Sequence, residues 1–351
     1  MQKIKSLYDI SLHITEEEYR KDKALSYSTL ARYEREGFNN LDKLFDKIET
    51  PSLTFGSCVD SIITGGMEEF NDRFVVADFP TTPDSIILIV KALFNKYSEI
   101  YNRLYLISDD SIINIAAEYN YQNNWKPETR AKVIKEKGSN YYSLLYVAKG
   151  KTIVDTNTYN DVIASVNALK ESDATRWYFA TDTPFDNIER LYQLKFKATI
   201  NNIDYRCMMD LVIIDHDNKI IYPCDLKTSS HKEWDFEESF STWKYMIQSI
   251  LYAAILKENL NKDDYFKNFE IKNYRFIVVN RYSLTPLVWE FPFTFTDKSL
   301  IDTKGNIYRH PFIIGEELNY YLNNNSKVPK NINTKDLNII KTLIPIENEN
   351  N

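Results

Sequence analysis

Two aspartates and a lysine lie close together on two neighbouring apolar segments in the middle of the chain. Asp210 is followed by an apolar run, a polar turn at residues 215–219, and a second apolar run that ends in Asp225, Leu226 and Lys227. Two such runs around a polar turn predict a pair of adjacent strands. Because residues two apart in a strand share a face, Asp225 and Lys227 are expected to face one site while Leu226 points away.

These residue types suit the hydrolysis of a phosphodiester bond with the help of Mg²⁺ or Mn²⁺. Such cations prefer oxygen ligands, which Asp210, Asp225 and the main-chain carbonyl of Leu226 can supply. Lys227 would position or help to deprotonate the attacking water and stabilise developing charge. An Asp-x-Lys triplet alone is commonly a solvated strand end. Here the charges lie on apolar runs whose faces should be buried, and an unused buried charge costs free energy, which favours a metal site.

A helix is predicted after the second strand, over residues 237–256, where apolar side chains recur at helical spacing. Tyr245, Gln248 and Tyr252 fall at i, i+3 and i+7 and therefore share one face of it. One interpretation is a half-buried face whose tyrosine hydroxyls find local partners. The other places Gln248 near the metal or phosphate, with the tyrosines lining a nucleic-acid channel. The residues alone leave both open.

Asp210, residues 225–227 and the stripe of Tyr245, Gln248 and Tyr252 together resemble the core signature of the PD-(D/E)XK nuclease superfamily. The branch in question contains phage recombination exonucleases similar to exodeoxyribonuclease VIII and lambda exonuclease. The resemblance implies an α/β fold with a restriction-endonuclease-like core, in which helices flank a mixed central sheet. It also implies a divalent-metal-dependent DNA exonuclease that acts on linear duplex ends in phage-type recombination or repair.

The same resemblance suggests further site residues. Ser28, which is expected to cap a helix, lies in a segment similar to the family's helix-opening serine motif and is a candidate DNA contact. Asp60 stands where the family often has a histidine metal ligand; a carboxylate suits Mg²⁺ at least as well, but Asp60 could also be an exposed helix residue or a lysine's partner. Glu189 resembles the family's upstream glutamate ligand, or is an ordinary charge at a hairpin edge. Gly56 is expected to let its helix pack closely against the active-site strands.

The chain is read as one elaborated domain in four parts. Residues 1–75 form the N-terminal helical part of the core, and residues 76–184 form a mostly helical insertion. Residues 185–296 hold the core sheet and its helix. Residues 297–351 contain a C-terminal helix and a tail rich in Asn, Lys and Glu, whose composition predicts disorder.

Composition limits the classes of protein to which this chain can belong. The 351 residues are 43% hydrophobic, enough for a substantial core. No run of about eighteen apolar residues and no signal-peptide core is present, which predicts a cytoplasmic protein without a membrane segment, in the host cytoplasm if a phage encodes it. The three cysteines and four histidines are scattered, so the sequence offers no disulfide framework, histidine-rich metal cluster or four-cysteine iron–sulfur cluster.

The net charge of −7 argues against indiscriminate nucleic-acid binding by the whole surface, but not against a local basic channel. Basic residues gather in two places, although such clusters are more often solvated faces. Arg206, on the strand that leads to Asp210, is the candidate DNA contact among them. The candidates are Lys126, Arg130, Lys132, Lys135 and Lys137 in the middle segment, and Lys195, Lys197 and Arg206 near the acid pair.

Two other functions stay open, because only the metal-hydrolase geometry comes from the residues themselves. A structure-selective or helicase-associated endonuclease would use the same chemistry and would cut closed circular DNA. A catalytically inactive nucleic-acid-binding or assembly protein would keep the fold; Asp60 in place of histidine allows it, while the retained charges of Asp210, Asp225 and Lys227 oppose it. The expected partner is linear double-stranded DNA, and analogy adds a homo-oligomer and a single-strand annealing protein.

Overall fold

The computed structural model describes residues 4–46, 48–78, 81–181, 187–292, 299–301, 305, 307–324 and 340–341. The chain divides into two compact units, one made of residues 1–60 and 164–351 and the other of residues 61–163. The bounds of the second unit differ from those of the predicted insertion, residues 76–184. Both candidate aspartates lie in the first unit.

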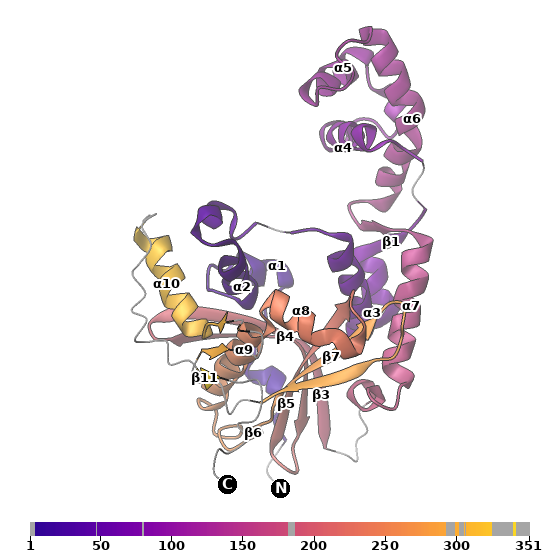
Figure 1. Cartoon of the computed structure of the whole chain (residues 1–351). Helices are drawn as coiled ribbons and strands as arrows, with labels where there is room; N and C mark the ends of the chain where they lie inside the picture. The colour runs from indigo at the N-terminus through magenta and orange to yellow at the C-terminus, as the bar shows by residue number, and fades with distance from the viewer. Residues whose placement is uncertain are drawn as a thin grey trace. The chain divides into compact units, whose positions relative to one another are not determined.

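A six-stranded mixed sheet forms the centre of the first unit (Figure 1). The strand order is β3-β4-β5-β7-β8, and a short β6 pairs with β5. Strands β3 to β5 form an antiparallel meander, β7 runs parallel to β5, and β8 runs antiparallel to β7. The predicted α/β class, with helices flanking a mixed central sheet, is confirmed. The strands are β3 (Ile188–Ile200), β4 (Ile203–Asp215), β5 (Ile220–Ser229), β6 (Glu270–Ile271), β7 (Tyr274–Asn280) and β8 (Leu287–Phe291).

The predicted hairpin around residues 215–219 is also confirmed, as β4, a tight turn and β5. The Asp215 carboxylate accepts hydrogen bonds from the main-chain N–H and the side-chain amide of Asn218, at 2.9 and 2.8 Å. Lys219 closes the turn with a φ of 54°. Apolar residues on both strands are fully buried, Ile213 and Ile221 among them. Burial of these side chains and the geometry of the turn therefore favour the same pairing register between β4 and β5.

Helices cover the sheet and extend its apolar core. Helix α9 (Tyr245–Leu260) packs against β3 and β4 and is buried along most of its length. Helix α2 (Tyr27–Glu36) packs against α9, and α10 (Pro311–Asn324) packs against both. The remaining helices with residues in this unit are α1 (Glu16–Lys21), α3 (Pro51–Arg73), α7 (Thr156–Glu171) and α8 (Phe236–Trp243).

Two local predictions need correction. The single helix predicted over residues 237–256 is broken into α8 and α9 at Lys244, whose φ of 59° and ψ of 42° are left-handed. Such a residue ends the run of helical hydrogen bonds, and the second helix starts in a new direction. The N-cap of α2 is Ser26 rather than Ser28, because the Ser26 hydroxyl accepts from the main-chain N–H of Thr29.

The second unit has an apolar core of its own, lined by Ile89, Leu93, Ile134 and Tyr142. Helix α6 packs against α4 and α5, and a Cβ at Gly138 would lie 2.6 Å from Val90, so glycine permits the approach of α4. A short parallel pair, β1 and β2, completes this unit. The elements are β1 (Phe74–Val76), α4 (Asp84–Tyr97), α5 (Asp109–Glu118), α6 (Pro127–Ala148) and β2 (Thr152–Val154).

The C-terminal part contributes α10 and a small three-stranded sheet in the order β10-β9-β11. Its strands are β9 (Leu300–Ile301), β10 (Ile307–Tyr308) and β11 (Ile340–Lys341). The rest of the tail that was predicted to be disordered lies outside the described residues. Among the helices that the structure describes, none combines the length and apolarity needed to cross a membrane.

Candidate active site

The two predicted acids lie where β4 and β5 separate. The ladder between these strands runs from Asp215 opposite Ile220 to Leu211 opposite Cys224, and there it stops. One step further, the same register places Asp210 opposite Asp225. Their side chains therefore share a face at the open end of the hairpin.

Leu226 connects the two acids through its backbone. Its main-chain N–H donates to Asp210 Oδ2 at 3.1 Å. Beyond the last backbone pair of β4 and β5, the Asp210 carboxylate therefore accepts the hydrogen bond that a main-chain carbonyl of β4 would otherwise accept. The N–H and C=O of one residue in an extended strand point to the same side. The Leu226 carbonyl, the predicted third oxygen ligand, therefore also faces the Asp210 side of β5.

Asp225 is the most enclosed member of the site, with 1% of its surface exposed. Gln248 on α9 donates its amide N–H to Asp225 Oδ1 and accepts from Lys227 Nζ at 3.0 Å. Lys227 Nζ also lies 2.5 Å from Asp225 Oδ2, as an ion pair without hydrogen-bond geometry, so this buried oxygen has no hydrogen-bond partner. The two carboxylates and the Leu226 carbonyl are oxygen donors, and this donor set fits Mg²⁺ or Mn²⁺.

The ammonium group of Lys227 is held against aromatic rings. It lies 4.4 Å from the ring centroid of Tyr245 and 6.0 Å from that of Tyr27, distances at which a cation is attracted to the ring face. Burial alone would lower the pKa of Lys227, but the charge of Asp225 together with Tyr245, Tyr27 and Asp210 outweighs burial and raises this pKa above its ordinary value. The Tyr27 hydroxyl donates to the Trp243 carbonyl at 2.7 Å, which fixes its ring between α2 and the end of α8.

Negative charge accumulates around Asp210. Burial, and then the neighbouring charges of Asp225 and Asp60, raise the pKa of Asp210 well above its ordinary value. Across the described parts of the chain, no three His, Cys, Asp or Glu side chains are close enough together to hold a metal ion by themselves. A cation here would therefore combine the acid pair with the Leu226 carbonyl and water, and Mg²⁺ commonly keeps several waters.

Gly56 and Asp60 bring α3 to the site. A Cβ at position 56 would lie 3.0 Å from Thr228 Oγ1, so the predicted role of Gly56 in close packing against the active-site strands is confirmed. Asp60 follows four residues later and lies on the same face of the helix. The close approach next to Lys227 thus directs the Asp60 carboxylate toward the sheet.

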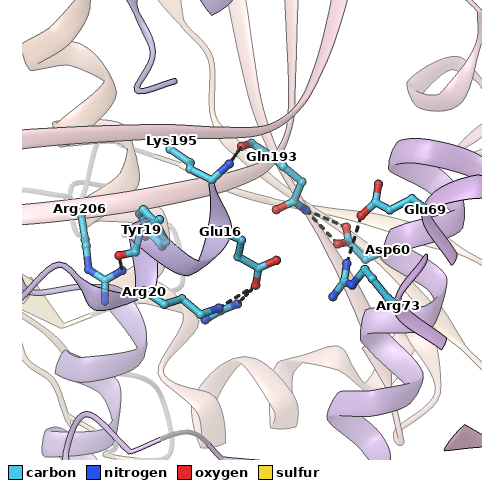
Figure 2. A network of polar contacts seen from close by, with 9 residues as sticks. All are labelled: Glu16, Tyr19, Arg20, Asp60, Glu69, Arg73, Gln193, Lys195 and Arg206. Carbon is cyan, nitrogen blue, oxygen red and sulfur yellow. Dashed lines mark hydrogen bonds and ion pairs between the residues drawn. The ribbon is translucent and has the colours of Figure 1, made fainter. Parts of the chain in front are cut away.

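Gln193 is a site residue that the sequence analysis missed. Its side-chain amide donates to both oxygens of the Asp60 carboxylate, at 2.9 and 3.0 Å (Figure 2). It lies on β3 between Tyr192 and Leu194, which pair with Leu211 and Met209, and so stands directly opposite Asp210. Its φ of 53° is left-handed, which nothing in the sequence indicates because the position is neither Gly nor Asn.

Glu189 lies at the other end of β3, away from the acid pair. It is opposite Ile214, four positions from Asp210, a separation of about 13 Å along an extended strand. Its carboxylate accepts from the Ser6 hydroxyl, the main-chain N–H of Leu7 at 3.4 Å and His216 Nε2 at 3.3 Å. In this structure Glu189 anchors the N-terminal segment to the sheet.

Arg206, a candidate DNA contact, is occupied within the protein. It is buried, and its guanidinium donates to the main-chain carbonyls of Ala24, at 3.1 Å, and Tyr19 (Figure 2). The guanidinium also lies 4.4 Å from the centroid of the Tyr19 ring. With its own N–H bonded to the Leu25 carbonyl at 2.9 Å, Arg206 attaches the segment before α2 to β4.

The remaining candidates differ in exposure. Tyr245 is half-buried and faces Lys227, while Tyr252 is buried with its ring 6.4 Å from that of Tyr274. The predicted stripe therefore enters the site at Tyr245 and Gln248, and Tyr252 belongs to the core behind it. Ser28 is exposed, and its hydroxyl lies 3.0 Å from that of Ser26.

No protein-family model matches the sequence, and no curated protein matches it significantly. A crystal structure of a protein from Eubacterium rectale, provisionally described as an exonuclease, is similar over 80% of this chain and 78% of its own, with 12% identity and a TM-score of 0.40. Similarity this low carries no information about the chemistry of this chain.

Proposed function

We propose that this chain is a divalent-metal-dependent nuclease, and more narrowly an exonuclease that hydrolyses phosphodiester bonds at the ends of linear duplex DNA in phage-type recombination or repair. Metal-dependent hydrolysis is supported by one observation above the others. Asp210 and the buried Asp225 stand opposite each other at the open end of the hairpin, and the Leu226 carbonyl faces the Asp210 side. The exonuclease activity and the duplex substrate rest on the resemblance of the motifs.

The proposed cofactor is Mg²⁺ or Mn²⁺. Asp210, Asp225 and the Leu226 carbonyl are the proposed ligands. Asp60 is proposed as an oxygen donor to water on the ion, because in the described residues no three acids are grouped closely enough to ligate it together. When bound, such an ion lowers the pKa of a water molecule and neutralises charge on the attacked phosphate.

The side chains around the acids supply orientation and charge. As the water oxygen bonds to phosphorus and the ester P–O bond breaks, negative charge grows on the phosphate oxygens, and the ammonium of Lys227 stabilises it. Gln248 contacts both Asp225 and Lys227, so it holds the acid and the base of the triplet in one arrangement. The rings of Tyr245 and Tyr27 shield the ammonium from water, which strengthens its electrostatic effect.

The test is the release of acid-soluble nucleotide from end-labelled linear duplex, closed circular duplex and single-stranded DNA, with Mg²⁺, Mn²⁺ or EDTA. Wild type is compared with Lys227→Ala and with the control Lys257→Ala, at an exposed lysine of α9. We expect metal-dependent loss of the linear duplex alone. Lys227→Ala should lower the rate by about a hundredfold or more, as for removal of one transition-state donor, and the control should match wild type.

Other results would redirect the assignment. Cutting of the closed circle would favour the structure-selective or helicase-associated endonuclease over the exonuclease. A folded wild type that cleaves none of the three substrates with either metal would refute the nuclease proposal. The remaining hypothesis would then be a DNA-binding or assembly protein.

The proposal includes two protein partners that rest on the resemblance alone: further copies of this chain and a single-strand annealing protein. Light scattering of the purified chain, with and without linear DNA, tests the first. A band shift of the nuclease–DNA complex by a purified annealing protein tests the second. A monomer at all concentrations and no ternary complex would remove both partners from the proposal without touching the chemistry.

A further inference from the structure

Gln193 has a backbone conformation that no other residue of β3 shares. Its φ is 53°, in the middle of a strand whose other residues have negative φ. The left-handed region costs free energy for any residue with a Cβ, and Gln lacks the short side chain that lets Asn or Asp adopt it more readily. A strained position of this kind persists only where the surrounding contacts determine it.

The strained residue lies directly across from a proposed catalytic acid. Pairing between β3 and β4 is continuous on both sides of this point, with Tyr192 opposite Leu211 and Leu194 opposite Met209. At Gln193 and Asp210 alone within this stretch the ladder lapses. The distortion therefore coincides with the site rather than with a strand end or a turn.

The side chain of Gln193 has a defined target. Its Nε2 donates to Asp60 Oδ1 at 2.9 Å and to Asp60 Oδ2 at 3.0 Å, so one amide group contacts both oxygens of the carboxylate (Figure 2). An amide is neutral, so this contact does not itself cancel the charge of the carboxylate. A lysine or arginine in the same place would compete with a cation for Asp60.

We propose that Gln193 is a positioning residue that orients the Asp60 carboxylate for the metal, and that the backbone strain at Gln193 is retained for this contact. The inference rests on the proposed function, because Asp60 acts there as an oxygen donor. Its alternative is a distortion that only shapes the strand, with the contact to Asp60 incidental. The two explanations differ in whether removal of the Gln193 amide weakens the binding of the metal.

The experiment compares Gln193→Gly and Gln193→Ala in the full chain, by thermal unfolding without metal and by Mn²⁺ titration without DNA. Glycine removes both the amide and the strain, whereas alanine removes only the amide. We expect Gln193→Gly to unfold a few degrees above Gln193→Ala. Both variants should bind Mn²⁺ about tenfold or more weakly than wild type, the usual effect of losing a group that orients a ligand.

Two further variants separate positioning from general structure. Lys219→Gly relieves a similar φ of 54° in the turn between β4 and β5, and it should raise the unfolding temperature while leaving Mn²⁺ affinity unchanged. Gln193→Asn accepts the left-handed conformation but is one methylene shorter, so it should bind Mn²⁺ as weakly as the alanine variant.

The failures can be told apart. Wild-type Mn²⁺ affinity in Gln193→Gly would overturn this inference and leave the proposed function standing. If wild type bound no Mn²⁺, or if Asp210→Asn and Asp225→Asn bound it as tightly as wild type, the proposed function would fall and this inference with it.

Discussion

Gln248 contacts both Asp225 and Lys227, so its contribution to stability and cleavage can be measured by substitution. Its amide donates to Asp225 and accepts from Lys227, and 3% of its surface is exposed. Gln248→Ala leaves the buried Asp225 and the half-buried Lys227 without their shared partner, which should cost about 2 kcal/mol or more of unfolding free energy in urea. Gln248→Glu still accepts from Lys227 but turns a carboxylate toward Asp225, so it should be less stable than wild type and slower in cleavage. A glutamate variant as active as wild type would contradict the arrangement.

Glu189 predicts how stability depends on pH. Burial alone would raise the pKa of Glu189, but hydrogen bonds from His216, Ser6 and the main chain of Leu7 outweigh burial and hold this pKa below its ordinary value. A carboxyl with a lower pKa in the folded state stabilises the protein above its unfolded pKa, and this contribution is lost as the pH falls through the folded pKa. Urea unfolding from neutral pH into the acid range should therefore show a steeper loss for wild type than for Glu189→Gln. Parallel curves would show that these contacts contribute little.

The hairpin of β4 and β5 could be predicted from the sequence, whereas the backbone distortions around it could not. Two apolar runs and a five-residue polar turn predict β4 and β5, but counting outward from that turn would place Asp210 opposite Cys224. The observed register, with Asp215 opposite Ile220, shifts the pairing by one and places Asp210 opposite Asp225. The break at Lys244 and the left-handed Gln193 carry no Gly, Pro or Asn to mark them. The conformation of Gln193 accompanies a contact with Asp60, a residue distant in sequence, which local propensity does not contain.

The loops that follow β5 and β7 are joined by one buried acid, Glu233, whose surface is fully enclosed. Its carboxylate accepts from the main-chain N–H groups of Asn280 and Thr285, at 3.0 Å each, and from the hydroxyls of Ser283 and Thr285, at 2.6 and 3.2 Å. Glu233→Ala leaves several buried donors unsatisfied and should cost about 3 kcal/mol or more in denaturant unfolding.

The matched control for this prediction is Glu238→Ala, at an exposed residue of α8 that pairs with His231 at 3.2 Å. An exposed side-chain contact of this kind contributes little, so its loss should change stability by less than about 1 kcal/mol. Equal effects of the two substitutions would mean that Glu233 does not hold the loops together.

For the whole molecule, the basic residues considered for a DNA channel are largely engaged with the protein itself. Lys135 lies 2.6 Å from Asp109, Lys197 lies 3.0 Å from Asp22, and Lys132 lies 3.9 Å from Glu136. Arg130 and Arg206 are buried. With a net charge of −7 as well, the DNA affinity that the proposed function requires should come from a few contacts at the proposed site.

Salt dependence tests this distribution of charge. Each phosphate neutralised by a cationic side chain adds about 0.9 to the slope of log affinity against log salt, so a few contacts predict a slope between about −1 and −3. Fluorescence anisotropy of a short linear duplex with Lys227→Ala, chosen to slow cleavage, should give this shallow slope in EDTA and tighter binding with Mn²⁺, because a site-bound cation would contact the phosphate. A slope of about −6 would instead require a broad basic surface. If the DNA affinity were the same with and without Mn²⁺, DNA binding would not involve the acid pair, and the interface would lie elsewhere on the chain.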